Sequence, residues 1–232
     1  MLGLGNSIIS GAALDEFSLD QISGLQAWYK FNTNLTYSGT SVTAWADSSG
    51  NGNDLTQTTA TNQGVKTSPE GGVHLDGNDN FMTLDTALDL TTFTVFACIT
   101  LDGTSLETLL GNGSNGNDWF RLNGSTWTLR TLNSSNQAGL TTAKGATDSY
   151  VLTLFTDVGA SSTKYTLRAT GEGAEGSGNI NNQIFTIGDL GRNSAGAYYF
   201  DGKVLELAIY NAELSQAQMD TIETDIVDRT GI

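Results

Sequence analysis

A nearly continuous run of apolar residues lies late in the chain, at Val204–Tyr210, and Glu206 is its one polar member. A strand at the surface alternates apolar and polar residues, whereas a strand that is apolar on both faces is covered on both sides. The pattern therefore predicts a buried strand inside a layered structure. The pair Asp201-Gly202 directly before it is typical of a turn.

The residues beyond Leu214 predict a short helix. Ser215 and Gln218 have the spacing of a capping box, and Leu214 is placed to contact Met219 as a hydrophobic staple. Gly231 ends the pattern, as glycine commonly does after a helix. The apolar positions in between recur at helical spacing: Met219, Ile222 and Ile226.

The rest of the chain shows the period-two alternation and the Gly- and Asn-rich turns of β-structure. Asn123-Gly124 predicts a hairpin over Trp119–Arg130, with Phe120 opposite Trp127 and their side chains on one face. No alternation of strands with helices occurs, so the pattern excludes a parallel sheet. We expect roughly twelve to fourteen strands at the spacing of a sandwich. The clearest of them span 24–31, 42–46, 73–82, 93–101, 119–130, 150–156, 163–170, 184–188 and 204–210.

Composition agrees with one large all-β domain. The chain of 232 residues has 28 glycines, a single proline and 38% hydrophobic residues, enough for a real core. The net charge is −15 and the basic residues are scattered singly, which argues against binding of nucleic acid. Cys98 is the only cysteine and lies in an apolar segment, so we expect a buried thiol and assembly in a reducing cytoplasm.

The first twenty residues lack any strand or helix period. We expect residues 1–20 to form an N-terminal arm and residues 21–232 to form the folded domain. The N-terminus has no Lys or Arg before Lys30, so it resembles neither a signal peptide nor a membrane span. We expect the arm to dock on a neighbouring subunit of a homo-oligomer through its apolar side chains: Leu2, Leu4, Ile8 and Ile9.

Several segments resemble, in order, the laminin-G-like domains of the concanavalin A-like lectin and glucanase group. They read GLQAWYKF, VTAWADSSGNGNDLT, VHLDGNDNFM, FTVFACITL, FTIGDLGR and YFDGKVLELAIYNAELSQAQMDTIE. The resemblance covers about residues 24–228 and implies an all-β fold, a jelly-roll sandwich of two antiparallel sheets with one short C-terminal helix. Similar domains often carry glutamate at the position of Glu206, which we interpret as structural.

The opening MLGLGNSI followed by such a domain also resembles virion proteins of tailed bacteriophages, especially marine ones. This resemblance implies a non-enzymatic structural protein of the virion, assembled in the host cytoplasm, that decorates the capsid or forms part of the tail or a fibre. Its partners would be other virion subunits, with no nucleic acid and no membrane. The alternative function is a glycan-binding adhesin for host recognition.

No set of residues matches the catalytic sites that the fold accommodates elsewhere. A glucanase of this fold needs carboxylates on one face of a strand, whereas Glu223 and Asp225 lie in the predicted helix and point apart. His74 is the only histidine and has no accompanying Gly-x-Ser-x-Gly elbow, so we expect a structural role for it. With one histidine and one cysteine, a zinc site is excluded, and we expect no enzyme activity and no required cofactor.

One loop carries the spacing of a calcium site, Asp47, Ser49, Asn51, Asn53 and Asp54. No carboxylate stands at the twelfth position of this loop, so any affinity would be weak, with Kd ~10⁻⁴–10⁻³ M. The same residues are also good turn formers, which is the alternative interpretation.

Glycan binding requires aromatic faces beside hydrogen-bonding side chains. The sequence offers two such groups: Trp119 with Arg121, and Tyr198-Tyr199 with Asn193. The alternative is that these aromatic side chains fill the core of the sandwich.

Overall fold

The computed structural model describes residues 17–67, 71–103, 105–114, 116–131, 149–158, 163–170, 175–179, 184–194 and 198–232. The expected assembly residues Leu2, Leu4, Ile8 and Ile9 lie outside this part. The elements are η1 (Leu19–Gln21), β1 (Leu25–Tyr29), β2 (Leu35–Ser38), β3 (Ser41–Trp45), β4 (Leu55–Thr56), η2 (Ala60–Asn62), β5 (Val65–Lys66), β6 (Val73–Asp76), β7 (Met82–Leu90), β8 (Thr94–Leu101), β9 (Leu106–Gly111), β10 (Trp119–Asn123), β11 (Thr126–Arg130), β12 (Ser149–Val158), β13 (Thr163–Ala169), β14 (Glu175–Asn179), β15 (Phe185–Leu190), β16 (Asp201–Tyr210) and α1 (Gln216–Thr230).

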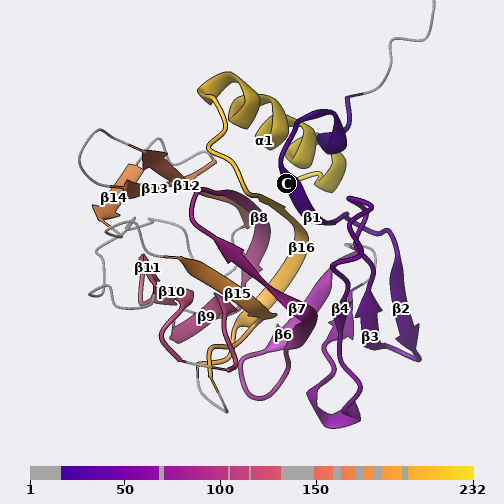
Figure 1. The fold of residues 1–232 in the computed structure, drawn as a ribbon. Coiled ribbons are helices and arrows are strands. Elements are labelled where there is room, and N and C mark those ends of the chain that lie inside the picture. Colours follow the sequence, from indigo (N-terminus) through magenta and orange to yellow (C-terminus); the bar gives the residue numbers. More distant parts are fainter. Residues whose placement is uncertain are drawn as a thin grey trace, which may run out of the picture.

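The strands form a sandwich in which the described pairs are antiparallel (Figure 1). One layer follows the order β11-β10-β9-β15-β7-β4-β3, and the other follows β5-β6-β16-β8-β12-β13-β14 with β1 beside β16. The pair Ser41–Val65 joins the layers at one edge, and the main core fills the space between them. Across that core the indole Nε1 of Trp127 donates to the hydroxyl of Tyr150 at 3.1 Å.

A second core lies on the outer side of β8 and β16, beneath α1. The side chains of β8 alternate between the two cores, with Ala97 facing the other layer and Cys98 facing the helix. The side chains of β16 alternate in the same way, with Leu207 in the main core and Ala208 in the second core, which confirms the layered position predicted for Val204–Tyr210. Burial raises the pKa of the Cys98 thiol to about 12, so the thiol is protonated and inert at neutral pH.

Helix α1 confirms the predicted start and stop signals. Ser215 accepts a hydrogen bond from the backbone N–H of Gln218, whose side chain completes the capping box. Gly231 adopts a left-handed conformation with φ 74°, and its N–H donates to the carbonyl of Val227 at 2.8 Å. Leu214 and Met219 are both buried in the second core, as the staple predicts. None of the described helices is long and apolar enough to cross a membrane.

The folded domain begins earlier than the predicted boundary at residue 21. Leu19 is completely buried in the second core, and its carbonyl accepts a hydrogen bond from the hydroxyl of Tyr210 at 2.9 Å. Phe17 packs against the same core. Residues 17–20 therefore belong to the domain. The predicted boundary was wrong because the spacing of apolar residues in this segment does not show which of them pack into the second core.

The predicted hairpin forms with a different register. Phe120 pairs with Leu129 and Leu122 pairs with Trp127, so the two turn residues are Gly124 and Ser125 rather than Asn123 and Gly124. The predicted faces are correct, because these four paired side chains are buried in the main core. The structure also contains short strands that the pattern did not resolve, namely β2, β4, β5, β9 and β14.

Candidate functional site

One end of the sandwich carries a polar pocket. The turn after β6, the turn after β8 and the segment that leads into β16 meet there, because Asp76 and Asp201 are paired residues on neighbouring strands. The pocket has a volume of about 230 Å³. Its lining combines carboxylates, hydroxyls and a backbone turn: Asp76, Gly77, Ser105, Leu106, Glu107, Tyr198, Tyr199 and Asp201. We call this region the rim pocket.

The carboxylates of the rim pocket have different proton affinities. Burial acts to raise the pKa of Asp76, but hydrogen bonds from the N–H groups of residues 78–80 outweigh it and lower that pKa. Burial raises the pKa of Asp201, and the nearby charge of Asp102 adds to the effect. Burial raises the pKa of Glu107 to about 7, against the opposing N–H groups of Asp201 and Ser105. The pocket therefore holds crowded negative charge that a cation or hydroxyl donors would relieve.

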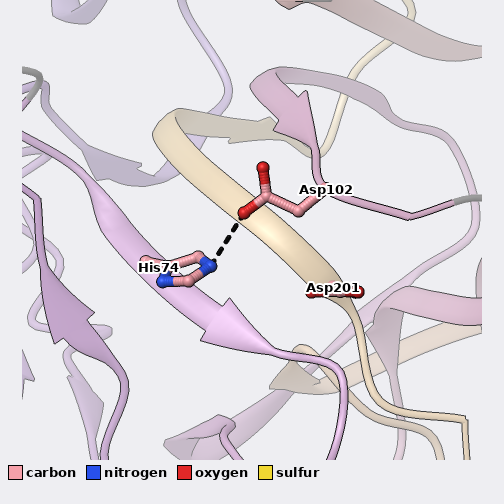
Figure 2. A group of neighbouring side chains, drawn as sticks. All are labelled: His74, Asp102 and Asp201. Atoms are coloured by element: carbon pink, nitrogen blue, oxygen red, sulfur yellow. Dashed lines mark ion pairs between the residues drawn. The ribbon is translucent and has the colours of Figure 1, made fainter. Parts of the chain in front are cut away.

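A histidine and two aspartates lie beside this pocket. Nε2 of His74 on β6 is 2.8 Å from Oδ2 of Asp102, and Asp201 at the start of β16 lies below them (Figure 2). One ligand atom of each residue lies within 4.8 Å of the others, a spacing that could hold a divalent cation. The sequence analysis excluded a zinc site by counting histidine and cysteine and placed a possible calcium site at Asp47–Asp54, so it did not consider this group of one histidine and two carboxylates. The signal missed was Asp201, interpreted as a turn residue.

The structure brings together three residues of the expected glycan site. The guanidinium of Arg121 lies 3.6 Å from the centre of the Trp119 ring and 5.4 Å from that of Tyr198. Trp119 is only 2% exposed, so its expected role as an open aromatic face is wrong: Arg121 covers it. Tyr198 is 44% exposed and adopts a left-handed conformation with φ 60°. Tyr198 therefore supplies the aromatic surface of this region.

The other two expected glycan residues have separate surroundings. Tyr199 lines the rim pocket and packs against Phe81, with ring centres 6.4 Å apart. Asn193 is 5% exposed, and its backbone lies so close to Gly111 that a Cβ there would come within 2.8 Å of it. Asn193 therefore supports the strands and does not offer its amide at the surface.

The loop with calcium-like spacing is held by hydrogen bonds within the protein. One carboxylate oxygen of Asp47 accepts from the N–H of Trp28 at 2.8 Å, and the other accepts from the N–H of Asn53 at 3.1 Å. Oδ1 of Asp54 accepts from the N–H of Asp47 at 2.8 Å. The side-chain nitrogen donors of Asn51 and Asn53 and the hydroxyl of Ser49 bond to carbonyls of β1 residues. These contacts give the residues a structural role, and calcium binding stays a prediction.

The acidic residues of α1 diverge, as expected. Oε1 of Glu223 accepts from Nε of Arg168 on β13 at 2.8 Å, whereas Asp225 pairs with Arg229 at 2.7 Å. Glu206 is completely buried and accepts hydrogen bonds from Trp28, Phe31 and Arg229, which confirms the structural interpretation of this residue.

No protein-family model and no curated protein matches the sequence. Among solved structures, domain 4 of AbnA, an extracellular arabinanase of Geobacillus stearothermophilus in complex with arabinotriose, is similar with a TM-score of 0.61 and 18% identity, over 86% of this chain and 98% of that one. Trypanosoma rangeli sialidase matches with a TM-score of 0.55 and 13% identity, over 87% of this chain and 33% of that one. A pentraxin of Limulus polyphemus matches with a TM-score of 0.51 and 13% identity, over 66% of this chain and 81% of that one. At these identities the likeness shows the fold alone: the chain is an all-β, concanavalin A-like antiparallel sandwich with one C-terminal helix.

Proposed function

We propose that this domain binds glycans without catalysing their hydrolysis, and that the rim pocket with Tyr198 is the binding site. The observation that carries the proposal is the half-exposed ring of Tyr198 beside a pocket lined by carboxylates and hydroxyls. A sugar presents an apolar C–H face to an aromatic ring, and its hydroxyls donate to nearby oxygens. The rim pocket offers both kinds of contact next to each other.

The surroundings of Tyr198 hold its ring in place. The N–H of Thr108 on β9 donates to the carbonyl of Tyr198 at 2.8 Å, and the guanidinium of Arg121 lies under the ring. A ring that is ordered before binding loses less conformational entropy when a ligand arrives. Domain 4 of the arabinanase, which shares the fold, is in complex with arabinotriose, and this supports a glycan as the ligand class.

The non-catalytic part of the proposal rests on Glu107, the carboxylate whose raised pKa would suit a general acid. Its Oε1 accepts from the N–H of Ser105 at 2.9 Å, and its Oε2 accepts from the N–H of Asp201 at 3.3 Å. The side chain is 2% exposed, so it holds two backbone segments together and does not present a proton to a ligand.

The test compares two exposed tyrosines that each contact a cation. Tyr198→Ala removes the aromatic ring of the proposed site. Tyr37→Ala is the control: Tyr37 lies on β2, is 48% exposed, and has the ammonium group of Lys66 over its ring. Isothermal titration with neutral arabinan, xylan and galactan oligosaccharides should show binding by the unmodified protein. We expect Tyr198→Ala to weaken it about tenfold, in line with the value of an aromatic contact, and Tyr37→Ala to leave it unchanged. Equal affinity of the two variants would contradict the proposed site.

The structural virion role stays a prediction. It depends on contacts between subunits made by the N-terminal arm, whose apolar residues lie outside the described part of the chain. The described residues give specific support to glycan binding.

A further inference from the structure

We propose that Arg121 and Arg130 bind a single anionic group, a carboxylate or a sulfate ester, carried by an otherwise neutral saccharide. This inference rests on the proposed function and names its ligand class. Arg121 lies beside Tyr198, and both arginines lie on the outer face of the layer that contains β9, β10 and β11. We call them the arginine pair.

The strand register places the arginine pair on one face. Arg121 lies opposite Thr128, and Arg130 lies opposite Trp119, so the two arginines are diagonal neighbours on adjacent strands. Paired residues in an antiparallel sheet point to the same side, and diagonal neighbours are about 7–8 Å apart. The buried partners Phe120, Leu122 and Leu129 occupy the opposite face, within the main core. Both guanidinium groups therefore emerge together, away from the core.

Neither arginine has an acidic partner among the residues that the structure describes, although the chain has 25 acidic residues and only ten basic ones. Within the described part of the chain, Nε of Arg121 and Nε of Arg130 are both buried without a hydrogen-bond partner. Both arginines are partly exposed, so they are not sealed inside the layer. By contrast, Arg168, Arg192 and Arg229 each pair with a carboxylate.

A third unsatisfied group lies in the same row of the sheet. Thr108 on β9 is directly opposite Arg121, is completely buried, and its hydroxyl has no hydrogen-bond partner in the described structure. Buried polar groups without partners cost free energy, and they are rare in folded proteins. Burial lowers the pKa of Arg121, and the charge of Arg130 adds to this effect against an opposing effect of Tyr198. An anion at this place would offset the repulsion between the two guanidinium groups and would accept hydrogen bonds from them.

The chemistry of guanidinium selects the ligand. Its planar fork of N–H donors matches the two oxygens of a carboxylate or a sulfate ester, and such bidentate pairs are among the strongest hydrogen bonds in proteins. The protein as a whole has a net charge of −15 and repels polyanions. This repulsion acts over a longer range than the attraction to the two positive charges of the arginine pair. A saccharide with one anionic group therefore suits the site better than a uniformly charged polymer.

The first experiment uses the unmodified protein and changes only the ligand. Isothermal titration would compare xylotetraose, the same oligosaccharide carrying one glucuronate group, the methyl ester of that glucuronate, and a singly sulfated analogue. We expect the charged forms to bind at least tenfold tighter than the neutral oligosaccharide. The methyl ester should lose this gain because it keeps the shape and removes the charge. The glucuronate and sulfate arms show which of the two anions the site prefers.

The second experiment locates the binding. Arg121→Gln and Arg130→Gln should each remove the advantage of the charged oligosaccharide, whereas Lys66→Gln deletes a positive charge that stacks on Tyr37 and should keep it. Thermal unfolding checks that each variant folds. If Arg121→Gln does not fold, Arg130→Gln and the methyl ester comparison carry the test.

The outcomes separate this inference from the proposed function. Equal binding of the charged oligosaccharide and its methyl ester would overturn the inference, as would a charge advantage that survives both arginine substitutions. If neutral oligosaccharides bind through Tyr198 while charge has no effect, the proposed function stands and the inference fails. If no oligosaccharide binds in either form, both fail together.

Discussion

The guanidinium of Arg229 near the end of α1 donates two hydrogen bonds to the completely buried carboxylate of Glu206 on β16, at 2.8 Å and 3.0 Å. The indole N–H of Trp28 donates to the same carboxylate at 2.7 Å, which links β1, β16 and α1 at one point. A buried charge is tolerated only when its hydrogen-bonding capacity is met. This contact therefore fixes the position of the helix on the sheet.

Removal of Arg229 should be strongly destabilising. Arg229→Met leaves the buried carboxylate of Glu206 without its cation, and loss of one partner of a buried pair costs about 3–5 kcal/mol. Asp225→Asn is the matched control, because it removes only the more exposed partner of the same arginine and should cost below about 1 kcal/mol. Urea unfolding of both variants measures the difference. Similar free energies of unfolding for the two variants would show that Glu206 does not depend on Arg229.

Asp47 should stabilise the protein in the absence of calcium. Asp47→Ala leaves the N–H groups of Trp28 and Asn53 without their acceptors, and we expect a loss of about 2–3 kcal/mol. The exposed Asp85→Ala on β7 is a control that should change little. Urea unfolding with a chelator and with added calcium provides the measurement. A loss that occurs only when calcium is present would favour the metal-binding role predicted from the loop spacing.

Glu107 should make the free energy of unfolding depend on pH between the pKa of this residue in the unfolded chain and its pKa in the folded protein. Burial and the charges of Asp201 and Asp102 raise its pKa from 4.5 to about 7 in the folded protein, against opposing N–H groups. The folded state therefore keeps a proton that the unfolded state releases, and this contribution is complete below pH 4.5 and is lost as pH rises to about 7. The loss is on the order of 3 kcal/mol.

The matched variant for this prediction is Glu107→Gln, which cannot titrate. The free energy of unfolding of the unmodified protein minus that of the variant should fall as pH rises through this interval. A difference that does not change with pH would contradict the raised pKa.

Two deletions separate the arm from the domain. A chain without residues 1–16 should keep its stability, because the domain residues from Phe17 onward remain. A chain without residues 1–20 also loses Leu19, whose burial is worth about 1.5–3 kcal/mol. Thermal unfolding compares the two.

Sedimentation of the shorter deletion tests the predicted assembly role. If the arm joins subunits, this chain should remain folded and become monomeric while the full chain is oligomeric. Equal oligomeric states would contradict the predicted contacts of Leu2, Leu4, Ile8 and Ile9.

Local features were determined by the sequence alone. The cap at Ser215, the stop at Gly231 and the burial of Val204–Tyr210 follow from residues a few positions apart, since helix caps and strand periodicity are short-range effects. The apolar face of the β10–β11 hairpin was predictable for the same reason, although its register was not. There a shift of the turn by one residue changed every cross-strand pair without changing the faces.

Only the tertiary structure decided which polar groups meet. His74, Asp102 and Asp201 come from three separate strands or turns, and Tyr198 reaches Arg121 from a segment more than seventy positions away. The same packing buried Trp119 and Asn193, which the sequence placed in an open site. No local spacing encodes these encounters, because they depend on how the two layers close and which loops then lie side by side. The arginine pair combines both cases. Its common face follows from strand alternation, whereas the lack of acidic partners among the described residues follows from the folded structure alone.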